Sequence, residues 1–278
     1  MKKINRRSFL AAAGLTAAAL ALTACGGSAS STASSTASSA ASSEAASTSA
    51  AAELTNVEAG KLTMATNAAF PPYEMTTDAG EFEGIDIDTA KAIAEKLGLE
   101  LQIDDMDFDA ALLSVQQGKA DIVMAGVTVT DERKAVMDFS DSYATGIQSI
   151  IVPEGSDITS PDDLAGKKIG TQRGTTGYIY CSDDFGDDAV VAYDDGLTAV
   201  QALNNGQVDA VVIDNAPAKE FVAANPGLVI LDTSYAEEDY AIGLAKGSAL
   251  EDAVNAALEE LKADGTLQSI VDKYITAE

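Results

Sequence analysis

Our prediction of the fold and of a ligand-binding site starts from one stretch of the sequence, Gly126-Val127-Thr128-Val129-Thr130-Asp131-Glu132-Arg133. It follows 122–125, a short apolar run that is typical of a buried strand. Thr130 or Asp131 can cap a short helix whose first turn would carry Arg133. The strand end then offers a carbonyl, free N–H groups, a hydroxyl and a guanidinium, a set that fits a small ligand with a carboxylate and an ammonium. A surface arginine after an ordinary turn is the alternative.

An internal repeat with an offset of 88 residues organises the rest of the chain. The end of one helix and the residue before one strand recur at this offset: Gly118 with Gly206, and Asp121 with Asp209. In the same register Gly126 corresponds to Asp214. Two αβ units of like design predict two lobes built alike. Because ligands of open α/β sheets lie beyond the carboxyl ends of strands, both positions are candidate site residues.

Apolar periodicity and glycine or proline breaks predict alternating strands and helices around this repeat. We expect strands at 61–66, 99–103, 122–125, 148–153, 167–171, 210–213 and 239–244, and helices at 84–98, 108–118, from about 178, 248–262 and 266–274. The stretches near 148–152 and 239–244 are predicted to cross between the lobes as a two-stranded hinge. The sequence thus predicts an α/β fold whose ligand cleft lies between lobe 1, residues 57–147 completed by 243–278, and lobe 2, residues 148–242.

Residues 1–25 have the pattern of an export signal. A basic start precedes an apolar run, 9–22, which is too short for a typical membrane-spanning helix. The run ends in Leu22-Thr23-Ala24-Cys25, which resembles a lipobox, so Cys25 would be lipidated and become the mature N-terminus; a plain secretory signal is the alternative. Residues 26–56 are almost all Ser, Ala and Thr, and we expect a disordered tether there. These features place the protein on the outer face of the cell membrane, held by a lipid anchor.

The composition excludes several classes of function. The net charge is −27 over 278 residues, and −31 without the basic residues ahead of Cys25, so the surface repels nucleic acid and anionic lipid headgroups. Histidine is absent, and no metal-ligand cluster or nucleophile elbow occurs, so we expect no metal and no cofactor. If Cys25 is lipidated, Cys181 has no intramolecular partner, and we expect it to be a packed thiol. We expect a monomer.

Seven short motifs occur in order along residues 57–278. They are Ala65-Thr66-Asn67-Ala68-Ala69-Phe70-Pro71-Pro72-Tyr73, Gly84-Ile85-Asp86-Ile87-Asp88, Met106-Asp107-Phe108, the stretch 126–133, Asp138-Phe139-Ser140, Gly174-Thr175-Thr176-Gly177 and Val212-Ile213-Asp214. In this order they resemble a bacterial extracellular solute-binding protein of the polar amino acid type, the receptor of an ABC importer. The resemblance implies the periplasmic-binding-protein fold. It also implies a protein that binds a polar L-amino acid outside the cell and delivers it to an ABC permease by lobe closure, without catalysis.

The resemblance implies how the ligand's two charges are held. Arg133 matches the arginine that binds the α-carboxylate, helped by the N–H groups of Thr128 and Thr176. Asp214 matches the acid that binds the α-ammonium, helped by the Gly126 carbonyl and the Thr128 hydroxyl. Burying a zwitterion is costly unless each charge meets an opposite charge and hydrogen bonds. With Arg133 in one lobe and Asp214 in the other, the ligand would complete a bridge that neither lobe makes alone.

The resemblance also assigns residues to the ligand's side chain. Phe70 and Phe108 match an aromatic pair that flanks it, although a lone phenylalanine is more often a core residue. Asn67 matches a side-chain-reading position that is often Asp, and its neutral amide weakens the case for lysine or arginine. Gln172, near Gly174, weakens the case for glutamate. The sequence therefore favours a polar neutral side chain, such as that of glutamine.

Two other kinds of function remain open from the sequence. An enzyme on the same fold, such as a dehydratase acting on a small carboxylate, could use Asp214 with Glu74 as paired carboxylates, although no histidine is present. A sensory ligand-binding module is less favoured, since no transmembrane helix or output domain is recognisable. We expect Asp86 and Asp88 to be a helix cap and a solvent-facing residue. The acidic run 237–239 is expected to be solvated surface.

Overall fold

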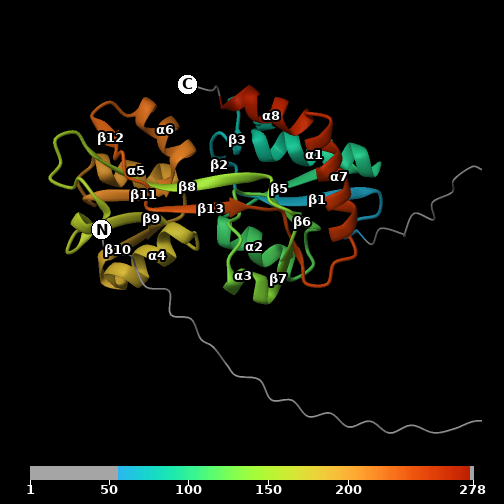
Figure 1. The fold of residues 1–278 in the computed structure, drawn as a ribbon, viewed down its shortest axis with the longest axis horizontal. Coiled ribbons are helices and arrows are strands. Elements are labelled where there is room, and N and C mark those ends of the chain that lie inside the picture. Colours follow the sequence, from blue (N-terminus) through green and yellow to red (C-terminus); the bar gives the residue numbers. More distant parts are fainter. Residues whose placement is uncertain (1–55, 276–278) are drawn as a thin grey trace, which may run out of the picture. The chain divides into compact units, whose positions relative to one another are not determined.

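The computed structural model describes residues 56–275, which fold into two α/β lobes (Figure 1). Each lobe is built on a sheet of its own, which confirms the two-lobed α/β prediction. The export signal, Cys25 and the predicted tether up to residue 55 lie outside the described residues. Within 56–275, no helix has the length and apolar character that crossing a membrane requires.

The sheet of lobe 1 has the strand order β5-β1-β6-β14-β7. Its members are β1 (Lys61–Thr66), β5 (Glu100–Asp105), β6 (Ile122–Val123), β7 (Met137–Phe139) and β14 (Gly243–Ala245). Strand β1 runs parallel to β5 and β6, whereas β14 is antiparallel to β6 and β7. Strands β1 and β6 are almost completely buried, as parallel strands with both faces covered should be. Because β14 belongs to this sheet, the end of the chain returns to lobe 1.

Within the described residues, five helices and a small hairpin sheet complete lobe 1 (Figure 1). They are α1 (Ile85–Leu97), α2 (Phe108–Gln116), α3 (Asp131–Val136), α7 (Glu251–Ala263), α8 (Thr266–Tyr274) and the strands β2 (Ala69–Phe70), β3 (Glu74–Thr76) and β4 (Phe82–Glu83). Of the two caps that the sequence allowed for α3, the structure uses Thr130, whose hydroxyl accepts the Arg133 N–H at 3.1 Å. The cap fixes the first turn of α3, and with it the start of the Arg133 side chain.

The main sheet of lobe 2 has the strand order β10-β9-β11-β8-β12. Its strands are β8 (Ala144–Pro153), β9 (Ile169–Gln172), β10 (Val190–Tyr193), β11 (Ala210–Asp214) and β12 (Leu228–Ile230). Its helices are α4 (Thr176–Phe185), α5 (Gly196–Asn204) and α6 (Asn215–Ala224), with two short 3₁₀ turns, Pro161–Leu164 and Asp187–Ala189. Helix α4 begins two residues before the predicted start, because the Thr175 hydroxyl caps it by accepting the Tyr178 N–H.

The repeat is visible in the backbone of both lobes. Gly118 and Gly206 each follow a helix end, and each has a φ of 66°, a left-handed conformation that favours glycine. Three residues later the backbone N–H of Asp121 donates to the Thr63 carbonyl, and that of Asp209 donates to the Lys168 carbonyl. The offset of 88 residues therefore marks two copies of one helix-to-strand connection.

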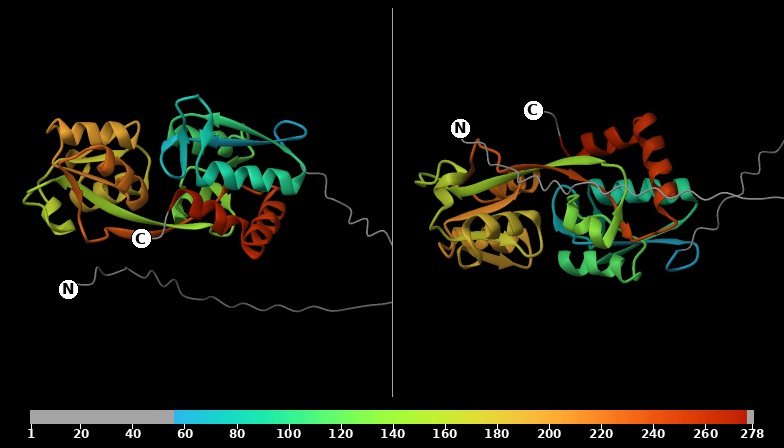
Figure 2. Two further views of the ribbon diagram at one scale, coloured as in Figure 1. Left: turned by 90° about the horizontal axis from the view of Figure 1, so that it is seen from above. Right: turned by 60° about the horizontal axis from the view of Figure 1, so that its bottom comes forward.

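Two antiparallel strands pass between the lobes (Figures 1 and 2). The first part of β8, 144–148, pairs with β13 (Ala236–Tyr240), with Ala144 opposite Tyr240 and Gln148 opposite Ala236. The sequence placed the first crossing at 148–152, which is about four residues too late. Residues 149–152 pair instead with β11 and β12 inside the sheet of lobe 2.

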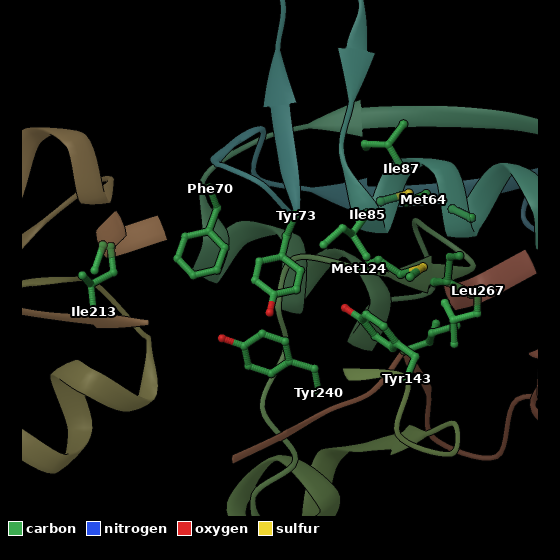
Figure 3. Close-up of a cluster of buried hydrophobic side chains, with 14 of the residues drawn as sticks. Met64, Phe70, Tyr73, Ile85, Ile87, Met124, Tyr143, Ile213, Tyr240 and Leu267 are labelled. Carbon is green, nitrogen blue, oxygen red and sulfur yellow. The ribbon is translucent and has the colours of Figure 1, made fainter. Parts of the chain in front are cut away.

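An aromatic group lies at the edge of the lobe 1 core. The rings of Tyr73 and Tyr240 meet edge to face with centroids 5.3 Å apart, and Phe70 stacks on Tyr73 at 5.9 Å. Figure 3 shows these three rings together, with Phe70 on the side toward Ile213 of β11. This packing holds the hairpin that follows β1 against the crossing strand β13 and places Phe70 beside the space between the lobes.

Candidate functional site

A pocket lies between the carboxyl ends of β6 and β11, where the two lobes meet. It has about 310 Å³ of empty space, including open solvent at its mouth. All eight residues that the sequence singled out line it: Asn67, Phe70, Phe108, Gly126, Thr128, Arg133, Thr176 and Asp214. Four further residues complete the lining: Glu74, Ala125, Gln172 and Thr175. The residues come from segments that are far apart in sequence, so the fold alone brings them together.

Arg133 is the cation of the pocket. The residue is 8% exposed, and its guanidinium lies 5.4 Å from the centre of the Phe108 ring. Nη1 donates to the Thr128 carbonyl at 2.7 Å, and Nη2 donates to the Gly174 carbonyl of lobe 2 at 3.1 Å. Since a guanidinium has five N–H donors, these bonds leave it able to donate to an anion in the pocket. Burial lowers the pKa of Arg133 from its usual value.

The two threonines meet across the pocket near the start of α4. The hydroxyls of Thr128 and Thr176 are 3.4 Å apart, and both lie within hydrogen-bond distance of Oε2 of Glu238, at 3.2 and 2.9 Å. Glu238 is on the crossing strand β13 and is 6% exposed. Because Thr176 is the first residue of α4, its N–H lies among the helix-terminal donors that have no acceptor within the helix. A carboxylate beside Arg133 would thus also meet a helix N-terminus.

Asp214 is an acidic residue at the carboxyl end of β11. It occupies the N-cap position of α6, yet its side chain makes no capping hydrogen bond. Oδ2 accepts from the Gln148 amide at 2.7 Å, and Oδ1, which is buried, has no partner within the described residues. Burial raises the pKa of Asp214 to about 7, opposed by hydrogen bonding to the hydroxyl of Tyr240 and to Gln148 and reinforced by the charge of Glu238. A cation placed in the pocket would satisfy the open oxygen and favour the ionised form.

Glu74 is a second acid of the pocket, and Asp86 lies close to it. Glu74 is completely buried, and its carboxyl group shares a hydrogen bond with the carboxylate of Asp86. Oδ2 of Asp86 accepts the Gly126 N–H at 3.0 Å and the Tyr143 hydroxyl at 2.8 Å. Burial, reinforced by the charge of Asp86, raises the pKa of Glu74 well above its usual range. Burial also raises the pKa of Asp86 to about 6, against the effect of the hydrogen bonds from Gly126, Tyr143 and Glu74.

Two side-chain amides join the lobes at the other end of the pocket. Asn67 of lobe 1 donates through Nδ2 to the Met106 carbonyl at 2.9 Å. Its Oδ1 accepts from Nε2 of Gln172, which belongs to β9 of lobe 2, at 2.8 Å. The amide of Asn67 is therefore engaged on both sides by the protein.

The aromatic residues and Gly126 define the wall of the pocket in lobe 1. The Phe70 ring lies so close to Gly126 that a Cβ there would come within 2.9 Å of it. Gly126 also has a φ of 55°, so both space and backbone conformation exclude a side chain. With Phe108 under Arg133 and Phe70 beside Gly126, two aromatic rings border the same polar space.

Two expectations about acidic residues were wrong. Glu238 is buried between the lobes instead of lying on a solvated surface, and Asp86 is completely buried instead of serving as a plain helix cap. For Glu238 a signal was present, because residues two apart on a strand share a face and Tyr240 is an apolar neighbour at that spacing. For Asp86 the sequence offered none, since its donors Gly126 and Tyr143 are 40 and 57 residues away.

The site does not resemble a metal centre. Within the described residues, no group of three or more His, Cys, Asp or Glu side chains could hold a metal ion. The groups that face the pocket are instead one guanidinium, carboxylates, hydroxyls and backbone amides, which suit a small ligand carrying both charges.

A polar pocket closed between two lobes that share a two-stranded connection defines a solute-binding protein of the two-lobed class. The model of the bacterial extracellular solute-binding proteins, family 3, matches residues 62–277, and the chain belongs to this family. A probable histidine-binding protein of Neisseria gonorrhoeae is 33% identical over 99% of this chain and 98% of its own length. The arginine-, lysine-, histidine-binding protein ArtJ of Geobacillus stearothermophilus has 34% identity and a TM-score of 0.75 over 78% of this chain and 96% of its own. An ancestral arginine-binding protein bound to glutamine has 43% identity and a TM-score of 0.75, covering 78% and 99%.

The comparisons confirm the class of function that the sequence predicted. The protein is a solute-binding component of an ABC importer that takes a polar amino acid, and it works outside the cytoplasm. Its relatives are binding proteins and not enzymes, so the dehydratase-like alternative receives no support.

Proposed function

We propose that the pocket binds its amino acid as a zwitterion held from both lobes. Arg133 binds the α-carboxylate together with the N–H groups of Thr128 and Thr176. Asp214 binds the α-ammonium together with the Gly126 carbonyl and the Thr128 hydroxyl. Each ligand charge then meets an opposite charge and hydrogen bonds, which is what a buried ion requires.

The single observation that carries this proposal is the open carboxylate of Asp214. An aspartate at a helix N-cap ordinarily accepts an N–H of the first turn. Asp214 does not, and its Oδ1 remains buried without a partner among the described residues while lining the same pocket as Arg133. A buried acceptor of this kind is costly when left unpaired, so a donor supplied by a ligand accounts for it.

We propose that the remaining lining residues contact the ligand's side chain. Phe70 and Phe108 flank its carbon atoms, and Asn67 lies at its far end. The relatives support this division, because their names specify histidine, arginine, lysine or glutamine. These ligands share the α-carboxylate and α-ammonium and differ only in the side chain. A site that holds the shared groups rigidly can therefore change ligand through a few residues at one end.

We further propose the assembly in which this site works. The protein acts as a monomer, and lobe 1 (57–143 with 243–275) closes on lobe 2 through the paired strands 144–148 and 236–240. Lipidated Cys25 anchors the chain through the Ser/Ala-rich tether 26–55, after removal of the signal peptide, and the closed form engages the permease. The support for the anchor is the lipobox-like sequence that ends at Cys25.

A ligand screen by thermal shift tests the proposal directly. Among the twenty amino acids, a cognate ligand at 100 times its Kd stabilises the folded protein by about 2.7 kcal/mol. Two relatives of that ligand serve as controls: the amine without the α-carboxylate and the acid without the α-ammonium. Neither should bind measurably, because each leaves Arg133 or Asp214 buried and unmatched. Equal stabilisation by either control would refute the two-ended clamp.

The lipid anchor has a separate test. Cys25→Ala should move the protein from the membrane fraction to the soluble fraction after detergent partition, while ligand binding stays unchanged. Membrane retention of this variant equal to that of the wild type would contradict anchoring through Cys25.

A further inference from the structure

Glu238 lies on a strand that crosses between the lobes, and it contacts both of them. It belongs to β13 and is not among the described residues that line the pocket. Its Oε2 accepts from the hydroxyl of Thr128 in lobe 1 at 3.2 Å and from that of Thr176 in lobe 2 at 2.9 Å. Tyr180 of α4 shares a further hydrogen bond with it. Glu238 therefore affects a ligand in the pocket through the groups that it holds.

The contact with Glu238 sets the direction of the Thr128 hydroxyl. A hydroxyl has one hydrogen to donate and two lone pairs that accept, whereas a carboxylate oxygen only accepts. Thr176, the nearer of the two threonines, donates to Glu238. The hydrogen of Thr128 then points either to Glu238 or to the Thr176 oxygen, which is 3.4 Å away. In both arrangements this hydrogen is used within the protein, and a lone pair of Thr128 remains for a donor in the pocket.

Glu238 also orients an amide that holds Asp214. Gln148 lies on the other crossing strand, β8, and its Nε2 is 3.1 Å from Oε2 of Glu238 and 2.7 Å from Oδ2 of Asp214. An amide nitrogen carries two hydrogens, so each acid receives one. The contact with Glu238 thus keeps the nitrogen of the amide turned toward Asp214. One oxygen of Asp214 is engaged in this way, and the other remains for a ligand.

From these contacts we infer that Glu238 is a positioning residue for the α-ammonium group of the amino acid. It makes the Thr128 hydroxyl an acceptor and, through Gln148, orients the Asp214 carboxylate. The inference rests on the proposed function, which places the ammonium between these two groups. Acceptors that the protein has already oriented need no rearrangement when the amino acid binds, and this raises the affinity.

The negative charge of Glu238 offers a competing explanation, because a carboxylate near the pocket also attracts an ammonium at a distance. The same charge repels the α-carboxylate of the amino acid, and it interacts with the charge of Arg133, which binds that carboxylate. The two effects of the charge on a zwitterion therefore oppose each other. The direction of the hydroxyl and of the amide, in contrast, concerns the ammonium alone.

Two conservative variants separate orientation from charge. Glu238→Gln keeps an acceptor oxygen at the same reach without the charge, whereas Glu238→Asp keeps the charge and withdraws the acceptor by one methylene. By calorimetric titration, Glu238→Gln should bind within about 3-fold of the wild type, and Glu238→Asp should bind about 10-fold more weakly. Glu238→Leu removes the acceptor altogether and should show at least the same loss. It replaces Glu238→Asp if that variant lacks the circular dichroism spectrum of the wild type.

The titrations use L-arginine, L-histidine and L-glutamine, together with whichever of the twenty amino acids stabilises the wild type most. Because all amino acids share the α-ammonium, each substitution should weaken every one that binds by a similar factor. A change in the preference among these amino acids would instead show an effect on the ligand's side chain and would contradict the inference.

A double-mutant cycle tests whether the effect passes through the hydroxyl. Thr128→Val removes the hydroxyl and keeps the shape of the side chain, so it should weaken binding about 10-fold. In the Thr128→Val background, Glu238→Asp should cost only about 3-fold or less, because the hydroxyl that Glu238 orients is gone. Two independent losses of about 10-fold each would show that Glu238 does not act through Thr128.

The neighbouring residue Glu237 provides a matched control, since it is exposed on the other face of β13. Glu237→Asp should bind like the wild type. A loss with Glu238→Gln as large as that with Glu238→Asp would assign the effect to charge, and wild-type affinity in both would remove Glu238 from the site. Either result overturns the inference and leaves the zwitterion clamp intact. Failure of the wild type to bind any of the twenty amino acids would overturn both.

Discussion

The two lobes share one framework and divide the chemistry of the site between them. Strand orders β5-β1-β6-β14-β7 and β10-β9-β11-β8-β12 correspond position by position, and each central parallel strand has an antiparallel neighbour that leads to the other lobe. At the end of the repeated strand, however, lobe 1 has Gly126 and lobe 2 has Asp214. In lobe 1 a loop follows and leads to Arg133, whereas in lobe 2 helix α6 begins at once.

A second difference lies between the first strand and the first helix of each lobe. In lobe 2 only the turn 173–175 separates β9 from α4, so a helix N-terminus reaches the pocket. In lobe 1 the hairpin β2–β4 is inserted between β1 and α1, and it carries Phe70 and Glu74. The comparison teaches that a duplicated scaffold can carry an acid at one strand end and, at the equivalent end, a glycine followed by a loop that leads to a cation.

Breaking either end of the clamp should have the largest effect. Arg133→Ala and Asp214→Ala should each weaken amino acid binding by about 2–5 kcal/mol, because each leaves one ligand charge buried and unmatched. Arg133→Ala should weaken all amino acids alike, since all share the α-carboxylate. Calorimetric titration with two or three ligands measures both effects.

An exposed neighbour provides the control for this experiment. Lys134→Ala removes a positive charge one residue away from Arg133 at an exposed position, and its affinity should stay close to that of the wild type. If Arg133→Ala kept wild-type affinity with an unchanged circular dichroism spectrum, its guanidinium would have no part in holding the carboxylate.

Mutating the two aspartates that the repeat relates, Asp121 and Asp209, should change the free energy of unfolding by different amounts. Asp121 is buried and accepts hydrogen bonds from Val57 N–H, Thr63 N–H and the Thr63 hydroxyl at 2.6–2.8 Å. Its counterpart Asp209 is exposed and accepts from the Lys168 N–H at 2.7 Å. Asp121→Ala should lower the free energy of unfolding by about 2–4 kcal/mol, and Asp209→Ala by about 1 kcal/mol or less. Equal losses in urea denaturation would show that the repeat is energetically symmetric.

The smallest expected effect concerns pH. Burial raises the pKa of Asp214 to about 7, so between about pH 4 and 7 the folded protein holds a proton that the unfolded chain has lost. Stability of the ligand-free protein should therefore fall as pH rises through this window. Asp214→Asn should remove about 1–3 kcal/mol of the fall between pH 5 and 8. A slope unaltered by Asp214→Asn would contradict the raised pKa.

The parts of the molecule that the sequence predicted are those with local signals. The repeat, the strand ends and the Thr130 cap depend on residues close together in the chain, and the eight candidate residues follow from strand ends and short motifs. Long-range features were harder. The first crossing was placed late because 148–153 is strongly apolar, whereas residues 144–147 include half-buried and exposed positions.

The buried acidic residues Glu74 and Asp86 show most clearly that contacts between distant parts of the chain are hard to predict from the sequence. Glu74 has no apolar pattern of its own, and its burial depends on a hairpin, a helix and the opposite lobe coming together. The role of Asp86 depends on donors from the β6 loop and from Tyr143 ahead of β8. A sequence read in short windows contains the residue types but not these distances, so Asp86 was predicted to be a helix cap and Glu238 to be solvated surface.

The hydrogen bonds that join the two lobes directly affect how strongly lobe closure depends on a bound ligand. The Arg133–Gly174 and Asn67–Gln172 hydrogen bonds join the lobes through groups of the protein itself. A ligand shifts an equilibrium only by its differential affinity for the two states, so bonds that already favour closure reduce the share that the ligand contributes. These two bonds therefore favour the closed arrangement of the lobes whether or not a ligand is bound. The degree to which closure reports a bound ligand depends on two contributions to the free energy of closure. One comes from the amino acid, and the other comes from hydrogen bonds that the protein makes on its own.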